Sequence, residues 1–278
     1  MNMPPRAIVT RPEREAVQWV QDLRAQGIDA QALPLLGIGA LRQPRLRQAL
    51  QQARQQAQGP QPRWQALMFV SPNAVRHFFQ DFEQNSAVPN ASPWGAAINF
   101  EAWAPGPGTA QALREAAVPA RRIVAPPAGS AQFDSEALWP LVAQQLAPGA
   151  RVLIVRGSDG SEQAGGQGRQ WLAQRLTGSG VAVDCVAAYE RCAAQLSASA
   201  LALARSAASD GSVWLLSSSE ALAQLGLALP GQSWQQAHAL ATHERIAQAA
   251  QAAGFGQVAQ CRPTLADVVA SIKSHHAR

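Results

Sequence analysis

The sequence predicts a doubly wound α/β protein with parallel sheets, and three observations lead to this fold class. Short apolar runs alternate with amphipathic helical stretches along the chain. Most of these runs are apolar at consecutive positions, which is typical of parallel strands that helices cover on both faces. The same succession of segments also occurs twice, at a spacing of about 145 residues.

The apolar runs give the expected strands. The first run meets Thr10, Arg11 and Pro12, after which the sequence turns helical. Most later runs are likewise followed by an amphipathic stretch, and a further strand is expected near Ala30. The runs expected as strands are 7–9, 66–70, 98–103, 122–124, 152–155, 181–185, 212–216, 237–240 and 257–260.

The repeat begins with a strand, an arginine, a helix, a glycine cap and a second strand. "AIVTRPEREAVQWVQDLRAQGIDAQAL" is echoed by "LIVRGSDGSEQAGGQGRQWLAQRLTGSGVAVDCV", with Arg11 matching Arg156 and Gly27 matching Gly180. "ALMFVSPNAVRHFF" is echoed by "VWLLSSSEALAQL", with Ser71 and Ser217 at the strand ends.

Two further segments complete each copy. "INFEAWAPGPGTAQALREAAV" is echoed by "HALATHERIAQAAQAAGF", and "RRIVAPPAGSAQFDSEALWPLVAQQL" by "GQVAQCRPTLADVVASIK". We therefore expect two similar domains. A cut near Pro148 would give domains 1–148 and 149–278. Alternatively, the chain leaves the first domain after "QALPLLGIGAL", completes a second domain and returns through "CVAAYERCAAQL", the two connections pairing as a ribbon.

Composition narrows the class of protein. With 278 residues and 47% apolar residues the chain can bury a core. No apolar run approaches the roughly 18 to 20 residues that span a bilayer, so a soluble cytoplasmic protein is expected. The spacing of Cys185, Cys192 and Cys261 supports neither disulfides nor a zinc site. The net charge of +5 comes from arginine, since Lys273 is the only lysine. It reflects either a GC-rich genome or an acidic ligand.

Seven stretches then occur in the order of one known family. They are "VTRP" before a helix, "LPLLGI", "FVSPNAV", "GPGTAQAL", "LIVRG" followed by "GRQWL", "AAYER" and "LLSSSEAL". Together they resemble uroporphyrinogen-III synthase over essentially the whole chain. The resemblance implies two flavodoxin-like domains of strand order 2-1-3-4-5, the second inserted into the first. Domain 1 is then 1–34 plus 193–278 and domain 2 is 42–184, with linker strands at 35–41 and 185–192.

The resemblance also implies a reaction. Hydroxymethylbilane, a linear tetrapyrrole with eight carboxylate side chains, is closed to uroporphyrinogen III with loss of water and inversion of the last ring. The substrate is a small molecule, and no cofactor, metal, nucleic acid or membrane partner is implied; a monomer is expected. Tyr189, the only tyrosine, matches the family's linker tyrosine and is expected to donate a proton to the leaving hydroxyl. The alternative is a packed aromatic that only caps a backbone group.

Substrate carboxylates are expected at the sheet edges. In an open parallel sheet the carboxyl ends of strands meet the amino ends of helices, where free N–H groups and the helix dipole attract anions. Two such edges facing one another would form a cleft between the domains. The residues expected there are Thr10, Arg11, Ser71, Asn73, Gly106, Thr109, Arg156, Gly157, Ser217, Ser218 and Thr242.

Each of these residues has a structural alternative. Arg11 and Arg156 also suit ion pairs, and Ser71 and Ser217 also suit helix N-caps. Thr109 matches a family threonine, whereas the second copy, "THERIA", has Ile246 where a threonine is usual and His243 where a glycine is usual. Only Thr242 is therefore carried over from that loop. The glycine-rich stretch 157–168 suits a lid or a tolerated surface insertion.

Other motifs are incomplete. "GPGTAQA" and "GGQG" do not complete a nucleotide loop, and "HERIA" lacks the second histidine of a zinc protease. The basic stretch "RQPRLRQALQQARQQAQ" suits a solvated helix face better than nucleic acid, because it lacks interleaved aromatics. A non-catalytic two-domain protein that binds an acidic small molecule is the alternative function.

Overall fold

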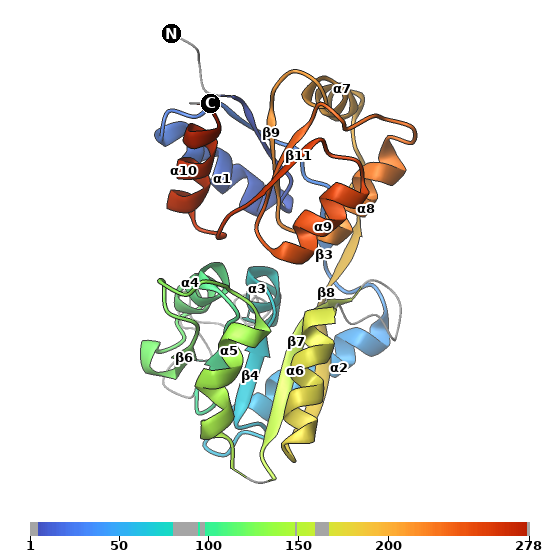
Figure 1. Cartoon of the computed structure of the whole chain (residues 1–278). Coiled ribbons are helices and arrows are strands. Elements are labelled where there is room, and N and C mark those ends of the chain that lie inside the picture. The colour runs from blue at the N-terminus through green and yellow to red at the C-terminus, as the bar shows by residue number, and fades with distance from the viewer. Residues whose placement is uncertain (1–4, 80–93, 95–97, 148, 159–166, 277–278) are drawn as a thin grey trace. The chain divides into compact units, whose positions relative to one another are not determined.

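The computed structural model describes residues 5–79, 94, 98–147, 149–158 and 167–276, and the statements below concern these residues. The chain forms two compact units, Met1–Gly37 with Cys192–Arg278 (unit 1) and Ile38–Arg191 (unit 2). In Figure 1 unit 1 contains the dark-blue N-terminal and the orange-red C-terminal segments, and unit 2 contains the light-blue to yellow segments. Most of the glycine-rich stretch, at 159–166, lies outside the described residues.

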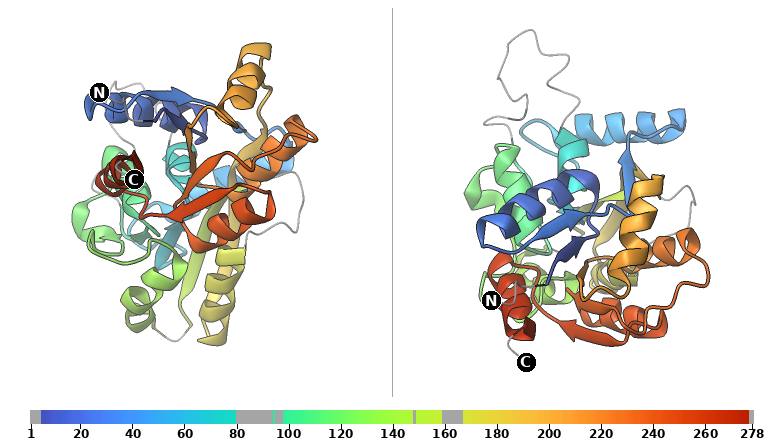
Figure 2. Two further views of the ribbon diagram at one scale, coloured as in Figure 1. Left: turned by 45° about the horizontal axis from the view of Figure 1, so that its top comes forward. Right: turned by 90° about the horizontal axis from the view of Figure 1, so that it is seen from above.

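Unit 1 is built on a five-stranded sheet in the order β11-β10-β9-β1-β2, and every pairing in it is parallel. The N-terminal strand β1 pairs with its sequence neighbour β2 on one side and with the distant β9 on the other. Figure 2 gives two further views of the chain in the same colours. The strands are β1 (Ala7–Val9), β2 (Ala30–Ala32), β9 (Val213–Leu216), β10 (His238–Ala241) and β11 (Gln257–Gln260).

Helices cover both faces of this sheet. Side chains alternate along β1, so that Ala7 and Val9 face α1 and α10 while Ile8 lies in the cluster with α7, α8 and α9. This arrangement explains why the strand is apolar at consecutive positions. The helices are α1 (Glu13–Ala25), α7 (Ala198–Ala207), α8 (Ser219–Ala228), α9 (Glu244–Ala252) and α10 (Leu265–His276).

Unit 2 repeats the pattern with one strand more, in the order β3-β8-β7-β4-β5-β6. The pairings from β8 to β6 are parallel. The strands are β3 (Leu36–Gly39), β4 (Ala66–Phe69), β5 (Glu101–Trp103), β6 (Ile123–Val124), β7 (Arg151–Ser158) and β8 (Ala182–Ala193). When β7 is taken as the first strand, both sheets have the order 2-1-3-4-5, so the predicted fold class is confirmed.

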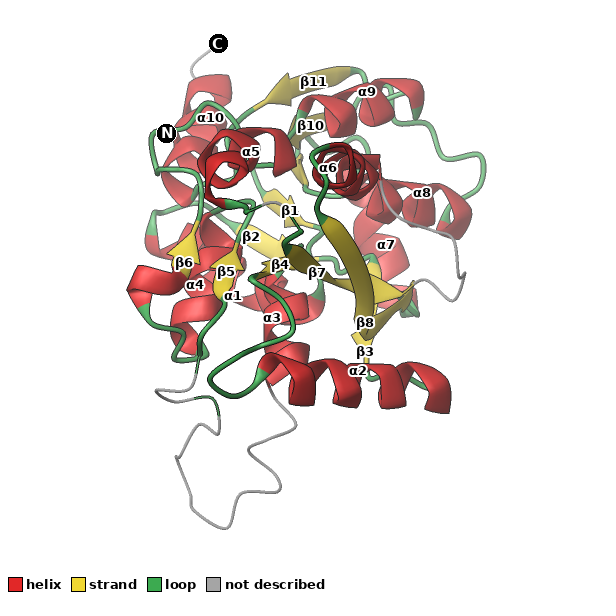
Figure 3. Cartoon of the chain, turned by 90° about the horizontal axis from the view of Figure 1, so that it is seen from below, coloured by secondary structure: helices red, strands yellow, loops and turns green. Residues whose placement is uncertain are grey.

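The two faces of the second sheet are also covered, as the red helices on either side of the yellow strands show in Figure 3. One face packs against α2, α3 and α4, and the other against α5 and α6. The helices are α2 (Pro44–Ala57), α3 (Pro72–Phe79), α4 (Pro107–Glu115), α5 (Ser135–Val142) and α6 (Gln167–Gly178). Short 3₁₀ turns lie at Ala120–Arg122 and Ala143–Gln145.

Matching details support the internal repeat. In each copy the helix after the first strand is followed by a glycine with positive φ, Gly27 at 76° and Gly180 at 78°. That backbone conformation strains any residue with a Cβ atom. The same turn therefore leads into β2 and into β8.

The connection between the units is part of a strand. β8 runs without a break from Ala182 to Ala193, although the sequence suggested a domain strand followed by a separate linker. β3 lies beside it at the sheet edge, and the Ala194 N–H donates to the Leu35 carbonyl at 3.3 Å. Gly37 makes room for this approach, since a Cβ there would lie 2.7 Å from Cys192 Sγ.

Candidate active site

The carboxyl edge of the unit 2 sheet carries a group of side chains around Tyr189, which we call the tyrosine cluster: Ser71, His77, Gly157 and Tyr189. The Ser71 and Tyr189 hydroxyl oxygens are 3.0 Å apart. Ser71 Oγ also accepts a hydrogen bond from the Ala74 N–H at 3.1 Å. Ser71 is therefore both the N-cap of α3 and a partner of the tyrosine.

The tyrosine ring is held from two sides. A register shift between Arg156 and Gly157 brings Gly157 opposite Tyr189 in the β7–β8 ladder. A Cβ at Gly157 would lie 2.6 Å from two ring carbons, so only glycine lets the ring lie this close to the strand. The His77 ring stacks on the tyrosine with centroids 5.5 Å apart. Tyr189 is 3% exposed.

The neighbouring α4 presents a helix N-terminus at the same edge. Gly106 is its N-cap and makes no side-chain capping bond. A Cβ there would lie 3.1 Å from Phe133 Cβ, so the glycine leaves room for this aromatic side chain. Thr109 is buried in the first turn of α4, and Asn73 is buried in the first turn of α3. Arg156 is half-buried near the end of β7.

In unit 1, Thr10 and Arg11 follow β1. The Thr10 hydroxyl is buried and donates to the Leu215 carbonyl at 2.7 Å, which joins the ends of β1 and β9. The Arg11 guanidinium lies 4.5 Å from the centroid of the Trp19 ring, as in a cation–π contact. Burial lowers the pKa of Arg11, while Glu15 and Cys261 act to raise it.

Cys261 lies near this arginine but is not a reactive thiol. Burial and the nearby Asp267 raise the pKa of Cys261 to about 12, against an opposing effect of Arg11. The thiol is therefore protonated at neutral pH and is a poor nucleophile.

The serines after β9 require a correction. Ser218, and not Ser217, is the N-cap of α8, and its Oγ accepts from the Ala221 N–H at 3.3 Å. Both Ser71 and Ser218 lie two residues after the last residue of their strand. The counterpart of Ser71 is therefore Ser218, whereas Ser217 corresponds to Val70. The sequence aligned the wrong serine because a run of three serines hides where the helix begins.

The next loop of unit 1 differs from its counterpart in unit 2. His243 is the N-cap of α9, and its Nδ1 accepts from the Arg245 N–H at 3.1 Å, whereas the matching Gly106 leaves α4 uncapped. Ile246 packs against the core at the position of Thr109. The Thr242 N–H donates to the Leu216 carbonyl at 3.1 Å. Because His243 already accepts from one backbone N–H group, the N-terminus of α9 has fewer N–H groups left for a ligand than the N-terminus of α4.

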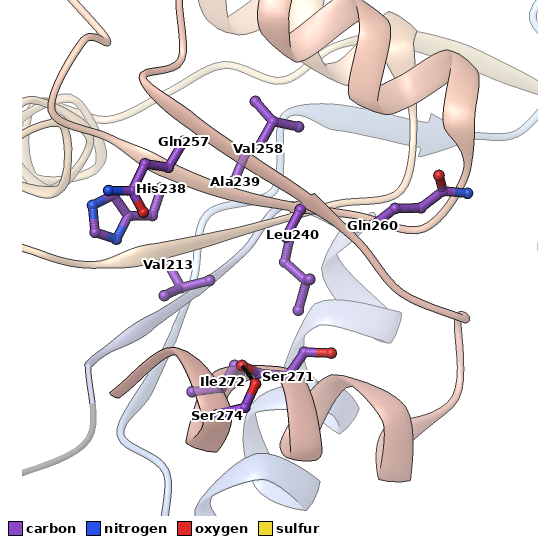
Figure 4. Close-up of a pocket in the computed structure, with 11 residues that line it drawn as sticks. Val213, His238, Ala239, Leu240, Gln257, Val258, Gln260, Ser271, Ile272 and Ser274 are labelled. Atoms are coloured by element: carbon purple, nitrogen blue, oxygen red, sulfur yellow. Dashed lines mark hydrogen bonds between the residues drawn. The ribbon is translucent and has the colours of Figure 1, made fainter. Parts of the chain in front are cut away.

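The residues described include no group of three or more His, Cys, Asp or Glu side chains that could hold a metal ion. A cavity of about 400 Å³ lies over β10 and β11 beside α10 (Figure 4). None of the predicted site residues lines it. Of the tyrosine cluster, the sequence analysis missed His77, because no motif marks this residue in the last turn of α3.

The architecture is similar to that of solved structures. The structure is similar to a mutant uroporphyrinogen III synthase from the extremely thermophilic bacterium Thermus thermophilus, with 15% identity and a TM-score of 0.54, over 99% of this chain and 98% of that chain. It is also similar to a uroporphyrinogen-III synthetase from Helicobacter pylori, with 15% identity and a TM-score of 0.51, over 99% and 100%. At this identity the likeness establishes the fold.

The sequence itself gives the family. A family model described as uroporphyrinogen-III synthase HemD matches residues 17–270, which is most of the chain and includes parts of both units. The resemblance inferred from the seven ordered stretches is thereby confirmed. The chain belongs to the uroporphyrinogen-III synthase family.

Proposed function

We propose that this protein closes hydroxymethylbilane to uroporphyrinogen III. The observation that carries the proposal is the family match over residues 17–270. As a member of this family the chain is a cofactor-independent lyase of haem biosynthesis. The alternative of a binding protein without catalytic activity is not favoured.

The reaction sets a problem of geometry. Loss of water from the terminal hydroxymethyl group gives an azafulvene, ring D attacks it through its substituted carbon, and the resulting spiro intermediate fragments and recloses. The substrate closes without inversion when left alone, so the protein must hold the reacting ends in one arrangement. A misplaced ring changes the product as well as the rate.

The protein can hold the substrate in one arrangement by binding its carboxylate groups. The uncapped N-terminus of α4 has backbone N–H groups and a positive helix dipole, and Thr109 and Asn73 lie in the first turns beside it. In unit 1 the corresponding donors are Arg11, Ser217 and Ser218, with Thr242 contributing less. A ligand with eight carboxylates has enough groups to use both edges.

Tyr189 is the proposed proton donor to the leaving hydroxyl. It is the only tyrosine in the chain, and its hydroxyl already lies in a hydrogen-bonded chain with Ser71. Replacing Tyr189 with Phe keeps the ring and removes the proton. We expect type III formation to slow by about tenfold to a hundredfold. This is at or below the smallest rate contributions typical of general acids, because this hydroxyl leaves readily without much assistance. Wild-type rates in that variant would remove the role.

The test of the overall proposal is a product assay. Freshly generated hydroxymethylbilane is supplied to the protein, and the type I and type III isomers are resolved by chromatography. The type III isomer should dominate with protein and the type I isomer without it. Type I product in both samples would eliminate the enzymatic function.

We further infer that the chain acts in the cytoplasm as a monomer. No helix in the described ranges is long and apolar enough to cross a membrane. Each unit also has its own apolar core on both faces of its sheet. Sedimentation equilibrium at micromolar concentration should give the mass of one chain, 29.4 kDa; a dimer mass would contradict the inference.

A further inference from the structure

We propose that Ser71 is a positioning residue for the acid: it donates a hydrogen bond to the oxygen of Tyr189 when that residue has given up its proton. The proposal rests on the proposed function, because it concerns how the proton donor of that reaction is prepared. Ser71 would thereby act through Tyr189, and the substrate carboxylates would be bound by other groups of the edge.

The direction of the hydrogen bonds follows from the chemistry of the three groups. The Ala74 backbone N–H can only donate, so Ser71 Oγ accepts there at 3.1 Å. The single hydrogen of the Ser71 hydroxyl remains available for the Tyr189 oxygen at 3.0 Å. Once Tyr189 is a phenolate it can only accept, and Ser71 is then its donor.

The helix behind Ser71 strengthens this arrangement. α3 runs from Pro72 to Phe79 and has no acidic residue in its first turn. Its positive N-terminal end therefore polarises the Ala74 N–H and the Ser71 hydroxyl toward the phenolate. Hydrogen bonds arranged in a chain reinforce one another, and a hydrogen bond to a charged oxygen is stronger than one to a neutral oxygen.

The phenol oxygen is kept at this position by the rest of the tyrosine cluster. Gly157 lies beneath the ring, where a Cβ would come within 2.6 Å of it, and His77 stacks on the ring. The ring cannot turn away from Ser71 without breaking the His77 stack. The other charged or titratable residues on the elements around the ring are Arg76 and His77 on α3, Arg151 and Arg156 on β7, and Asp184, Cys185, Glu190, Arg191 and Cys192 on β8.

The proton balance is complete without another reagent. Tyr189 gives its proton to the hydroxyl of the substrate, the carbon–oxygen bond breaks, and water leaves from an azafulvenium cation. The unsubstituted α-carbon of ring D loses a proton after the last carbon–carbon bond has formed. That proton restores the phenol, so Tyr189 carries the negative charge, and Ser71 donates to its oxygen, only between these two steps.

The single tyrosine makes a direct test possible. Tyrosinate absorbs in the near ultraviolet, and Tyr189 is the only tyrosine of the chain, so an absorbance titration of the whole protein reports one pKa. Removing the Ser71 hydroxyl should raise that pKa by about one to two units, since a hydrogen bond to the charged form is lost. Ser71→Gly is the preferred variant, because glycine at an N-cap costs helix stability little.

Two control variants distinguish a pKa change caused by loss of the Ser71 hydroxyl from one caused by loss of a helix cap. Ser197 caps α7 through the Ala200 N–H at 3.2 Å, so Ser197→Ala removes a cap of the same kind and should leave the Tyr189 pKa unchanged. Ser71→Thr keeps the hydroxyl and should restore the wild-type pKa. Circular dichroism over the same pH range verifies that each variant stays folded. Ser71→Ala provides a second variant that lacks the hydroxyl.

The proposal is overturned if both hydroxyl-free variants titrate like the wild type. It is supported if the pKa rises and the alkaline limb of kcat for type III formation moves to higher pH by the same amount. The absorbance titration does not depend on turnover, so it stays decisive if the product assay shows no type III isomer. Failure of the enzymatic proposal and failure of the Ser71 proposal are thus distinguishable.

Discussion

Gly157 lacks a side chain at the place where the Tyr189 ring lies against the strand. The first two atoms that a Cβ would meet are ring carbons at 2.6 Å, and the third is the hydroxyl oxygen at 3.0 Å. The sequence marked Gly157 as an open backbone donor for the substrate. The structure shows a steric role for Gly157, which the sequence could not predict because Tyr189 is distant along the chain.

Gly157→Ala should therefore disturb Tyr189 in particular. We expect a loss of about 1–3 kcal/mol in the free energy of unfolding, as for overpacking elsewhere, together with a shifted absorbance titration of the tyrosine. Urea unfolding and the titration measure the two effects. Gly178→Ala is the matched control, since a Cβ at Gly178 meets nothing within 4 Å. Identical behaviour of the two variants would refute the steric role.

The sequence predicted where several polar residues lie in the fold, but it did not predict their hydrogen-bond partners. Ser71 was expected as an N-cap or a ligand, and it is an N-cap. Its contact with Tyr189 joins residues 118 positions apart and depends on the β7–β8 register shift. No local pattern encodes that register. Thr10 was placed correctly at the strand end, yet its hydroxyl bonds to the neighbouring strand.

Among the elements, α3 shows how a short helix is fixed at both ends. Ser71 caps its N-terminus, and Arg54 of α2 donates to the carbonyls of His77 and Phe78 at its C-terminus, in the latter case at 2.8 Å. Arg54 is 5% exposed, although the basic stretch that contains it was predicted to be a solvated face. The pattern of arginines in α2 does not reveal that one of them faces inward.

Arg54→Met should destabilise the protein through α3. Methionine fills similar volume but leaves the two carbonyls without these donors, so we expect a loss of about 2–4 kcal/mol in the free energy of unfolding. Arg47→Met, on the exposed face of the same helix, should change it by about 0.5 kcal/mol or less. Urea denaturation of both variants gives the comparison, and equal effects would show that the C-terminal contacts are unimportant.

Strand β8 also carries a pH-dependent contact at its beginning. Asp184 accepts hydrogen bonds from Trp64 Nε1 at 2.7 Å and from Arg151 at 2.9 Å. Burial acts to raise the pKa of Asp184, but these hydrogen bonds, with the charges of Arg151 and Arg63, outweigh it and lower the pKa below its ordinary value. A carboxyl with a lowered pKa stabilises the fold above its ordinary pKa, and this contribution is lost as the pH falls.

Asp184→Asn should thus lower the stability at neutral pH and matter less in acid. We expect the difference from the wild type in the free energy of unfolding to shrink as the pH falls from about 4 through the lowered pKa. Urea unfolding at a series of pH values tests this. A difference that stayed constant down to acid pH would show that the charge of Asp184 contributes nothing. Asp29→Asn, at an exposed position of unit 1, provides the comparison.

For the molecule as a whole, the sequence was sufficient for the architecture. The order of apolar runs and their repetition predicted two similar α/β domains, and the family resemblance supplied the strand order 2-1-3-4-5, which both sheets have. Buried strands can be recognised in the sequence because a strand covered by helices on both faces is apolar at every position, as in β1 and β4. The continuity of β8 was not predictable, since nothing in "AVDCVAAYERCA" marks where the strand leaves its sheet partner.

The repeat also predicts that unit 2 is self-sufficient. It is continuous in sequence, and its sheet has an apolar core on each face. A fragment of residues 36–193, which keeps β3 and β8 whole, should unfold cooperatively in urea and retain the wild-type pKa of Tyr189. A fragment without a cooperative transition would show that unit 2 depends on unit 1.

The register shift between Arg156 and Gly157 also places Tyr189 within a single unit. Tyr189 lies in the part of β8 that is paired with β7, and each contact described for its ring or hydroxyl comes from unit 2. The acid and its supporting groups would travel together as one piece in any hinge motion of the enzyme. Under the proposed mechanism the proton transfer would take place within unit 2, while both units would contribute groups that hold the substrate carboxylates.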